Sequence, residues 1–215
     1  MNEQITIRKY ESRDRDDVRR ISCQTAFLGM SISDFLGDEE IIADALTIYY
    51  TDYEPESCLV AVKNEKVVGY LIGSIDVAKA HSVNGKITNA LVKKAFKKGI
   101  FLSAKAWVFF LRVFWSALKG EFLAPNFSKE YPATLHINID ENFRGQRVGS
   151  QLIEQYLIYL KAHKAVGIHF GTISERAKKF FIRNGFQLLL EAKRSYLSFY
   201  TVDPVKYYVF GKKLI

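Results

Sequence analysis

The stretch from Thr134 to Leu160 most constrains the fold, because two different hydrophobic periods follow one another in it. From Thr134 to Asp140 apolar residues alternate with polar ones, which predicts a β-strand. After residue 149 the apolar side chains have helical spacing, at Leu152, Ile153, Tyr156, Leu157 and Leu160. The segment RGQRVG (144–149), with two glycines, lies between them. The stretch therefore predicts a strand, a glycine-bearing turn and a helix.

Such a turn exposes several backbone N–H groups at a helix N-terminus, where the helix dipole favours an anion. We therefore expect a phosphate group at residues 145–150. Two common kinds of phosphate-binding loop are excluded, because the chain has no GxxxxGK[ST] motif and no GxGxxG motif after a strand.

The other segments predict a mixed α/β domain. Strands are expected at 5–10, 134–140, 167–173, 187–200 and 206–214, with a hairpin at 57–77 around the turn KNEK. Helices are expected at 14–27, 38–50, 149–162 and 174–186. The apolar face of helix 38–50 is predicted at Ile42, Ala45, Leu46 and Tyr49. Strands 134–140 and 167–173 should be parallel neighbours joined by helix 149–162.

The bulk composition favours one domain over residues 1–215. The chain is 48% hydrophobic, which suits a globular core with room for a large insertion. Cys23 and Cys58 have no metal-ligand spacing, so neither a disulfide framework nor a metal site is expected. The first ten residues contain no apolar signal segment, and a cytoplasmic location is the expectation.

The basic character of the chain is concentrated in one segment. The net charge is +8, and residues 76–132 contain ten Lys or Arg against three acidic residues. This segment, at about 77–132, is predicted to be a helical insertion. In it Lys98, Lys105, Arg112 and Lys119 recur every seven residues, while the other side chains from 100 to 118 are apolar or small.

The insertion helix is predicted to be buried on most sides, with helix 87–97 as its partner. Its aromatic side chains would line an acceptor pocket, an acyl pocket or a dimer seam: Trp107, Phe109, Phe110, Phe114 and Trp115. A membrane span is disfavoured because Lys105 and Arg112 would each cost about 3 kcal/mol near its middle. Contact of residues 99–119 with a membrane surface stays open. Nucleic acid is not an expected partner, because the cations alternate with a hydrophobic helix instead of exposed aromatic side chains.

Two motifs resemble the GNAT superfamily of acyl-CoA-dependent N-acyltransferases. Residues 144–149 match the family turn [RQ]xxGx[GA], except that Arg147 occupies the first glycine position. The segment SERAKKFFIRNGF matches the family pattern N-x-x-A-x-x-F-Y-x-x-x-G-F at Ala177, Phe180, Gly185 and Phe186. Ser174 replaces the usual Asn and Phe181 the usual Tyr. The resemblance covers residues 4–75 and 133–213.

The resemblance implies a mixed, mostly antiparallel sheet with a central parallel strand pair, flanked by helices on both faces. It also implies acetyl-CoA as co-substrate, with its pyrophosphate on the amides of residues 145–150 and its pantetheine arm along strand 137–139. The amide near Ile139 would polarise the thioester carbonyl. The cofactor-binding residues so implied are Ile137, Asn138, Ile139, Arg144, Gly145, Gln146, Arg147, Val148, Gly149, Ser150, Ser174, Ala177 and Phe181.

Phe181 has no proton to give, so another group must serve the acid–base chemistry. His169 and His136 are the candidates, because each lies on the polar face of one of the two central strands and an imidazole titrates near neutrality. Both could instead be hydrogen-bonded strand residues. Tyr131, Tyr196 and Tyr200 rank lower as proton donors. Core packing is the plainer role for Phe180 and Phe181, and helix capping for Ser174.

The expected function is acetyl transfer from acetyl-CoA to a primary amine by direct attack, since no Cys is placed to form an acyl-enzyme. The acceptor would be a small-molecule or peptide amine, and a homodimer is possible. The alternative is a non-catalytic acyl-CoA-binding protein or a protein that associates with a membrane surface.

Overall fold

Seven strands and six α-helices make up the part of the chain that the computed structural model describes, which is residues 4–25, 38–198 and 205–214. The strands are β1 (Thr6–Lys9), β2 (Leu59–Lys63), β3 (Lys66–Ser74), β4 (Thr134–Ile139), β5 (Gly167–Thr172), β6 (Gln187–Arg194) and β7 (Val205–Lys213). The helices are α1 (Arg15–Thr25), α2 (Glu39–Tyr53), α3 (Val77–Lys97), α4 (Ala104–Leu118), α5 (Val148–Ala162) and α6 (Glu175–Arg183).

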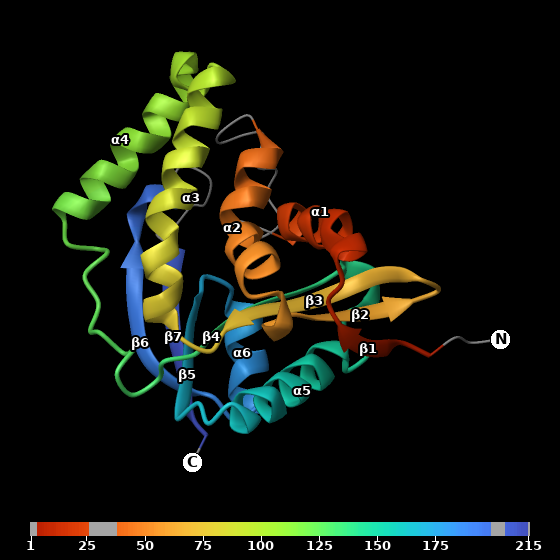
Figure 1. Cartoon of the computed structure of the whole chain (residues 1–215). Coiled ribbons are helices and arrows are strands. Elements are labelled where there is room, and N and C mark those ends of the chain that lie inside the picture. The colour runs from red at the N-terminus through yellow and green to blue at the C-terminus, as the bar shows by residue number, and fades with distance from the viewer. Residues whose placement is uncertain (1–3, 26–37, 199–204, 215) are drawn as a thin grey trace.

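The strands form two antiparallel sheets, with orders β1-β2-β3-β4 and β5-β7-β6 (Figure 1). One parallel bridge joins them, between Ala133 and Ile168. There the N–H of Ala133 donates to the carbonyl of Gly167 at 3.1 Å, and the N–H of His169 donates to the carbonyl of Ala133 at 2.9 Å. The sequence predicts that β4 and β5 are parallel neighbours. In the part of the chain that the structure describes, this bridge is the only pairing between the two strands, which form no ladder beyond it.

Helices cover both faces of the first sheet. α1 and α2 pack on one face, where Val18 and Ile21 meet Tyr70 and Ile72. α5 packs on the other face, and α6 packs on β6 and β7. The predicted face of α2 is partly wrong, because Ala45 is exposed whereas Asp44 and Thr47 are buried.

The predicted boundaries hold well at the hairpin and less well near the C-terminus. The turn between β2 and β3 has positive φ at Asn64 (49°) and Glu65 (61°), as a two-residue hairpin turn requires. The predicted strand 187–200 ends at Arg194, where Glu121 accepts a hydrogen bond from the backbone N–H of Ser195 and a short 3-10 turn begins. Residues 26–27 of the predicted first helix and residues 199–200 lie outside the described residues.

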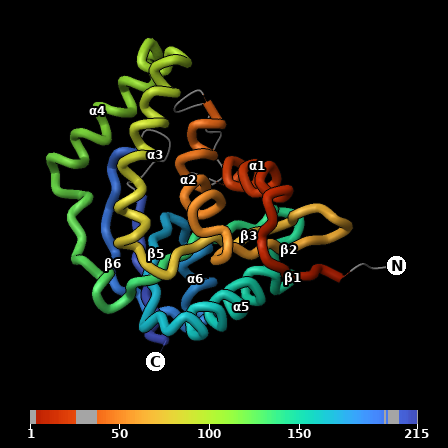
Figure 2. The backbone as a smooth tube through the Cα atoms, viewed as in Figure 1, coloured from red at the N-terminus to blue at the C-terminus, as the bar shows by residue number. Residues whose placement is uncertain are grey.

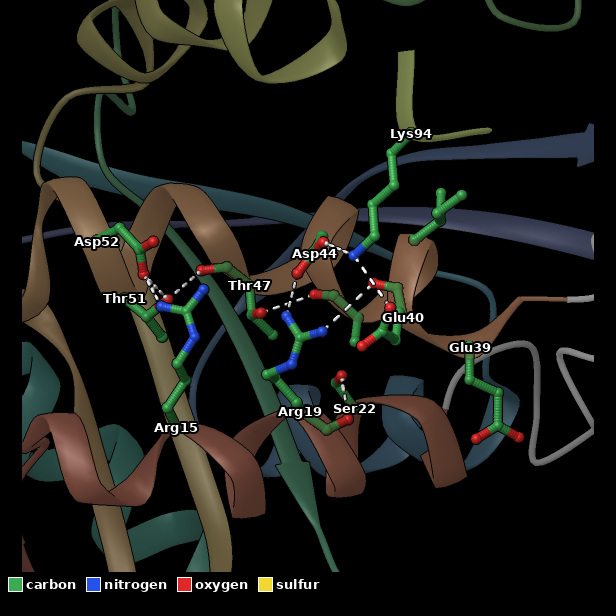
Figure 3. Close-up of polar contacts among 12 residues, drawn as sticks. Arg15, Arg19, Ser22, Glu39, Glu40, Asp44, Thr47, Thr51, Asp52 and Lys94 are labelled. Atoms are coloured by element: carbon green, nitrogen blue, oxygen red, sulfur yellow. Dashed lines mark hydrogen bonds and ion pairs between the residues drawn. The ribbon is translucent and has the colours of Figure 1, made fainter. Parts of the chain in front are cut away.

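The insertion is a pair of helices, α3 and α4, whose path Figure 2 traces at the upper end of the molecule. α3 begins at an Asp76 cap, ten residues before the predicted start, and packs against α2. Its lysines pair with acidic residues of α2 and its cap: Lys94 with Glu40 and Asp44, and Lys98 with Asp38 and Glu40 (Figure 3 shows the Lys94 pairs).

The prediction that the insertion helix is buried on most sides is wrong for α4. Trp107, Phe114 and Trp115 are more than half exposed, and Phe110 is also exposed. α4 contacts the rest of the protein through a face that includes Ala106, Phe109 and Ser116, which leaves its two tryptophans and Phe114 outside. Within the residues that the structure describes, no helix is long and apolar enough to cross a membrane.

Candidate functional site

The turn between β4 and α5 has two left-handed residues. Asp140 accepts a hydrogen bond from the N–H of Asn142 at 3.0 Å and starts a 3-10 turn. Gly145 then has φ 83°, and Arg147 has φ 62° and ψ 5°. Arg147 therefore adopts the conformation that usually favours glycine, at the position where the sequence motif has a glycine. α5 begins directly after it, at Val148.

The first amides of α5 are available to an anion. The first hydrogen bond of the helix runs from the N–H of Gln151 to the carbonyl of Arg147, at 3.1 Å. The N–H groups of Val148, Gly149 and Ser150 precede it and have no carbonyl partner in the helix, and Arg147 provides no side-chain cap. These donors lie at the positive end of the helix dipole. Such donors can bind a phosphate, and a phosphate at this turn stays a prediction from the sequence.

One edge of β4 faces the gap between the two sheets. The N–H of Asp140 donates to the carbonyl of Val68 in β3, and the N–H of Ala133 donates toward β5. Because the register with β3 is unbroken and successive N–H groups alternate sides, those of Leu135, Ile137 and Ile139 point toward β5. Beyond the Ala133 bridge β5 does not pair with them. An extended ligand arm can therefore hydrogen-bond this edge, next to the turn.

His169 lies where the two sheets diverge. Its ring Nδ1 contacts the carbonyl of Tyr131, which only accepts, so Nδ1 donates and Nε2 is the nitrogen left without a proton. Burial lowers the pKa of His169, the hydrogen bond to Tyr131 partly offsets this, and His81 of α3 lowers it further. The ring also lies 6.2 Å from that of Phe127, centroid to centroid.

His136 occupies a different environment, on the face of β4 that meets α1. Its Nε2 lies 3.1 Å from Nδ2 of Asn138, which also donates to the Tyr70 hydroxyl at 2.7 Å. Burial lowers the pKa of His136 to about 4. Because Nε2 already accepts a hydrogen bond and is so weakly basic, His136 is poorly suited to be a general base near neutral pH. Asn138 therefore supports a polar cluster with its side chain, and only its backbone belongs to the β4 edge.

The motif around α6 contributes packing more than ligand contacts. Ser174 caps α6 by accepting from the N–H of Ala177 at 3.2 Å, and Ala177 packs on the main core. Phe181 is only 4% exposed and packs against Phe170 with ring centroids 4.5 Å apart. The position of Phe181 therefore favours core packing, which the sequence also allowed, over a contact with the cofactor.

Two of the lower-ranked proton donors have enclosed side chains. Tyr131 is buried, and Tyr196 packs between Phe109 and Phe122; Tyr200 lies outside the described residues. A surface cavity of about 400 Å³ is lined by residues of β1, β2, α5 and the 3-10 turn before β2, such as Lys9, Tyr159 and Glu56, and none of the predicted site residues lines it. In the described ranges no three His, Cys, Asp or Glu residues gather to hold a metal ion.

The sequence named Tyr131 only as a lower-ranked proton donor and did not place it, or any other residue, next to His169. Tyr131, Phe127 and His81 all belong to the insertion, which carries none of the recognised motifs. No local signal marks them, because they reach His169 only through the tertiary fold.

Comparison with solved structures identifies the architecture. The structure of SsHAT matches with a TM-score of 0.67 and 20% sequence identity, over 99% of each chain. The fold is that of the GNAT N-acetyltransferases. A polyamine N-acetyltransferase from Drosophila melanogaster, which forms N-acetylagmatine, matches with a TM-score of 0.58 and 12% identity over 98% of this chain and 100% of that one.

A further GNAT structure is similar in the same way. The ribosomal-protein-S18-alanine N-acetyltransferase from Escherichia coli has a TM-score of 0.56 and 12% identity, over 98% of this chain and 94% of that one. No protein-family model matches the chain, and neither does any curated protein sequence. The similarity therefore lies in the fold, and the activity has to be argued from the site.

Proposed function

We propose that this chain is an N-acetyltransferase that transfers the acetyl group of acetyl-CoA to a primary amine by direct attack. The observation that carries the proposal is the turn at residues 144–150, which places free amides at the start of α5 directly beside the open edge of β4. A ligand with a pyrophosphate and an extended amide-bearing arm matches these two features together.

The positions of the turn and of β4 define the direction in which the arm of the ligand would run. A pyrophosphate on the amides of residues 145–150 lies at the C-terminal end of β4. An arm that follows β4 from there runs toward Ala133, where His169 begins the divergence of the sheets. In this placement the N–H groups of Ile137 and Ile139 bind the arm and the thioester carbonyl, and they stabilise the negative charge that develops on the carbonyl oxygen.

His169 is the proposed base. Its Nε2 takes a proton from the incoming ammonium, and the neutral amine nitrogen then attacks the thioester carbon. The C–N bond forms, the C–S bond breaks, and the thiolate of coenzyme A leaves. The attacking nitrogen gives up its second proton, which passes through water to the thiolate, and His169 returns the first proton to solvent. Phe181, buried in the core, supplies no proton to that thiolate.

The acceptor is proposed to be a small-molecule or peptide amine. The similar structures include a polyamine acetyltransferase and a ribosomal-protein alanine acetyltransferase, so the fold serves both classes. The residues around His169 come from the insertion. The acceptor preference of this chain would therefore differ from those of the similar structures.

The test is the release of coenzyme A thiol from acetyl-CoA in the presence of agmatine, spermidine and a peptide with an N-terminal alanine. Calorimetry with coenzyme A should first show binding. Binding without amine-dependent thiol release from any acceptor would favour the alternative, a non-catalytic acyl-CoA-binding protein. Absence of binding would reject the assignment of the turn.

A further inference from the structure

α4 carries more exposed large apolar side chains than any other element of the described chain, and most of them lie on its outer face. We define it by five side chains whose exposed fractions lie between 54% and 61%: Trp107, Leu111, Phe114, Trp115 and Leu118. Leu102 before the helix and Leu123 after it are exposed by 90% and 82% and extend the apolar surface at both ends. So many exposed apolar side chains on one face of a helix indicate a docking site, since monomeric soluble proteins rarely leave large apolar patches in water.

The outer face points away from the protein because the opposite face of α4 is the one that packs against it. The inner face of α4 follows the helical period with Ala106, Phe109, Val113 and Ser116, which are buried or half-buried. Ser116 contacts Ser195, with hydroxyl oxygens 3.1 Å apart, and the Phe109 ring packs on Tyr196. The outer face follows the same period on the opposite side of the helix. Figure 1 shows α4 at the edge of the molecule, beyond α3.

The helix pair that carries the outer face is strongly basic. Residues 77–120 contain nine Lys or Arg and no Asp or Glu, although the whole chain has a net charge of only +8. Lys105, Arg112 and Lys119 recur every seven residues and form one edge of the outer face, and Lys93 and Lys97 of α3 are exposed nearby in the same helix pair. The surface is therefore apolar in its centre and basic at its margin.

These properties match an anionic bilayer surface. Trp, Phe and Leu side chains insert at the boundary between headgroups and acyl chains, while lysines at the edge of the helix meet anionic headgroups. A second copy of the chain fits less well, because a two-fold contact between two outer faces would bring two basic edges together. Nucleic acid would leave the apolar centre uncovered.

We propose that α4 lies flat on the surface of a membrane that contains anionic lipid, with its outer face in the headgroup boundary. The inference goes beyond acetyl transfer and needs no catalytic step. Membrane contact and acetyltransferase activity can therefore fail independently of one another.

The chain offers a direct probe, because its only two tryptophans, Trp107 and Trp115, both lie on this face. Tryptophan emission is measured while vesicles of 70% phosphatidylcholine and 30% phosphatidylglycerol are added, and sedimentation with the vesicles gives the bound fraction. The expected result is a blue shift of the emission and binding that falls about 10-fold or more when salt is raised or when the vesicles are pure phosphatidylcholine.

Three variants separate the contributions. Leu111→Glu places a charge in the middle of the outer face and should weaken binding at least 10-fold. Lys105→Gln with Lys119→Gln should weaken binding to anionic vesicles about 10-fold or more and leave the weak binding to neutral vesicles unchanged. Ile158→Glu alters an equally exposed apolar side chain on α5 and should bind like the wild type. All four substituted positions are exposed, so folding should be retained, which circular dichroism checks.

The proposal is overturned if the anionic vesicles cause neither a blue shift nor sedimentation. Equal binding to neutral vesicles, insensitive to salt, overturns the assignment to anionic lipid. A concentration-dependent dimer in the absence of lipid that Leu111→Glu dissociates would make this face a seam between two copies and would equally overturn it.

Discussion

Gly149 lies directly against Phe180. A Cβ placed on Gly149 would be 3.0 Å from Cζ of Phe180, closer than nearly all such contacts in proteins. The glycine in the first turn of α5 therefore admits an aromatic ring of α6, in addition to any ligand that approaches its amide. The two motifs recognised in the sequence meet at this contact, since one contains Gly149 and the other Phe180.

Replacing Gly149 by Val should displace Phe180. The cost is expected at about 1–3 kcal/mol of unfolding free energy, which is typical of overpacking. In a Phe180→Ala background the same replacement should cost less, because the ring is gone. Urea denaturation of the wild type, both single variants and the double variant gives the coupling energy. If the costs of the two single replacements simply add in the double variant, the contact with Phe180 is not the reason for a glycine at position 149.

Arg147→Gly should stabilise the turn or leave it unchanged, because a left-handed residue other than glycine costs about 1–2 kcal/mol. Coenzyme A affinity should stay within a few fold, since the proposed site uses the amide of residue 147. Arg147→Val should lose both stability and affinity. Arg144→Gly removes the same charge where φ is −69°, and it should lower the unfolding free energy. Calorimetry and urea denaturation measure both quantities, and a large loss of affinity in Arg147→Gly would mean that the side chain binds the ligand.

His169→Ala should lower turnover by about 10²-fold or more with little change in coenzyme A affinity. Burial lowers the pKa of His169 below its usual 6.5, so the wild-type rate should rise with pH through that lowered value as the ring loses its proton. This acidic limb should disappear in the variant. His163→Ala is the matched control, because the His163 ring also contacts a carbonyl but lies exposed at the end of α5. If His169→Ala kept the wild-type turnover, His169 would be a structural residue and not the base.

His136 should make folding sensitive to acid. Its pKa is about 4 in the folded chain against 6.5 in the unfolded chain, so the unfolded state binds more protons between these values. The contribution of His136 to the unfolding free energy should be constant above pH 6.5 and decrease as pH falls toward 4, by at most about 3 kcal/mol. His136→Gln should flatten this slope. Urea denaturation from pH 4 to 7 measures it, and equal slopes would place the acid sensitivity elsewhere.

Asp44 should contribute more to stability than Asp52, although each pairs with an arginine of α1 (Figure 3). Burial alone would raise the pKa of Asp44, but its hydrogen bonds to Lys94 and Arg19 outweigh burial and lower it. Asp44→Asn should cost about 1–3 kcal/mol, because a half-buried charge pair is broken. Asp52→Asn should cost less than about 1 kcal/mol, as exposed pairs do.

The pH dependence distinguishes the two variants further. The stability from Asp44 is present above its unfolded pKa of 3.8 and is lost as pH falls through the lowered folded value. Asp44→Asn should therefore remove part of the acid denaturation below pH 4. Equal costs for the two variants would contradict the importance of burial here.

The sequence by itself determined the local elements. The hairpin around KNEK, the strand and helix on either side of RGQRVG, and the Ser174 cap all follow from side-chain period and from residues a few positions apart. The motif placed Arg147 at a position normally filled by glycine, and the structure shows a positive φ of 62° there. Such features depend on neighbours along the chain, which is why they could be predicted.

Only the tertiary structure decided which faces of these elements are covered. Phe181 enters the core because Phe170, eleven residues earlier, meets it there, and His169 takes its tautomer from Tyr131, 38 residues away. The insertion was recognised as helical, but its period could not tell that α4 would contact the protein through Ala106 and Ser116 and leave its tryptophans outside. Two apolar stripes on one helix look alike in sequence, and only the packing of distant segments selects the one that is buried.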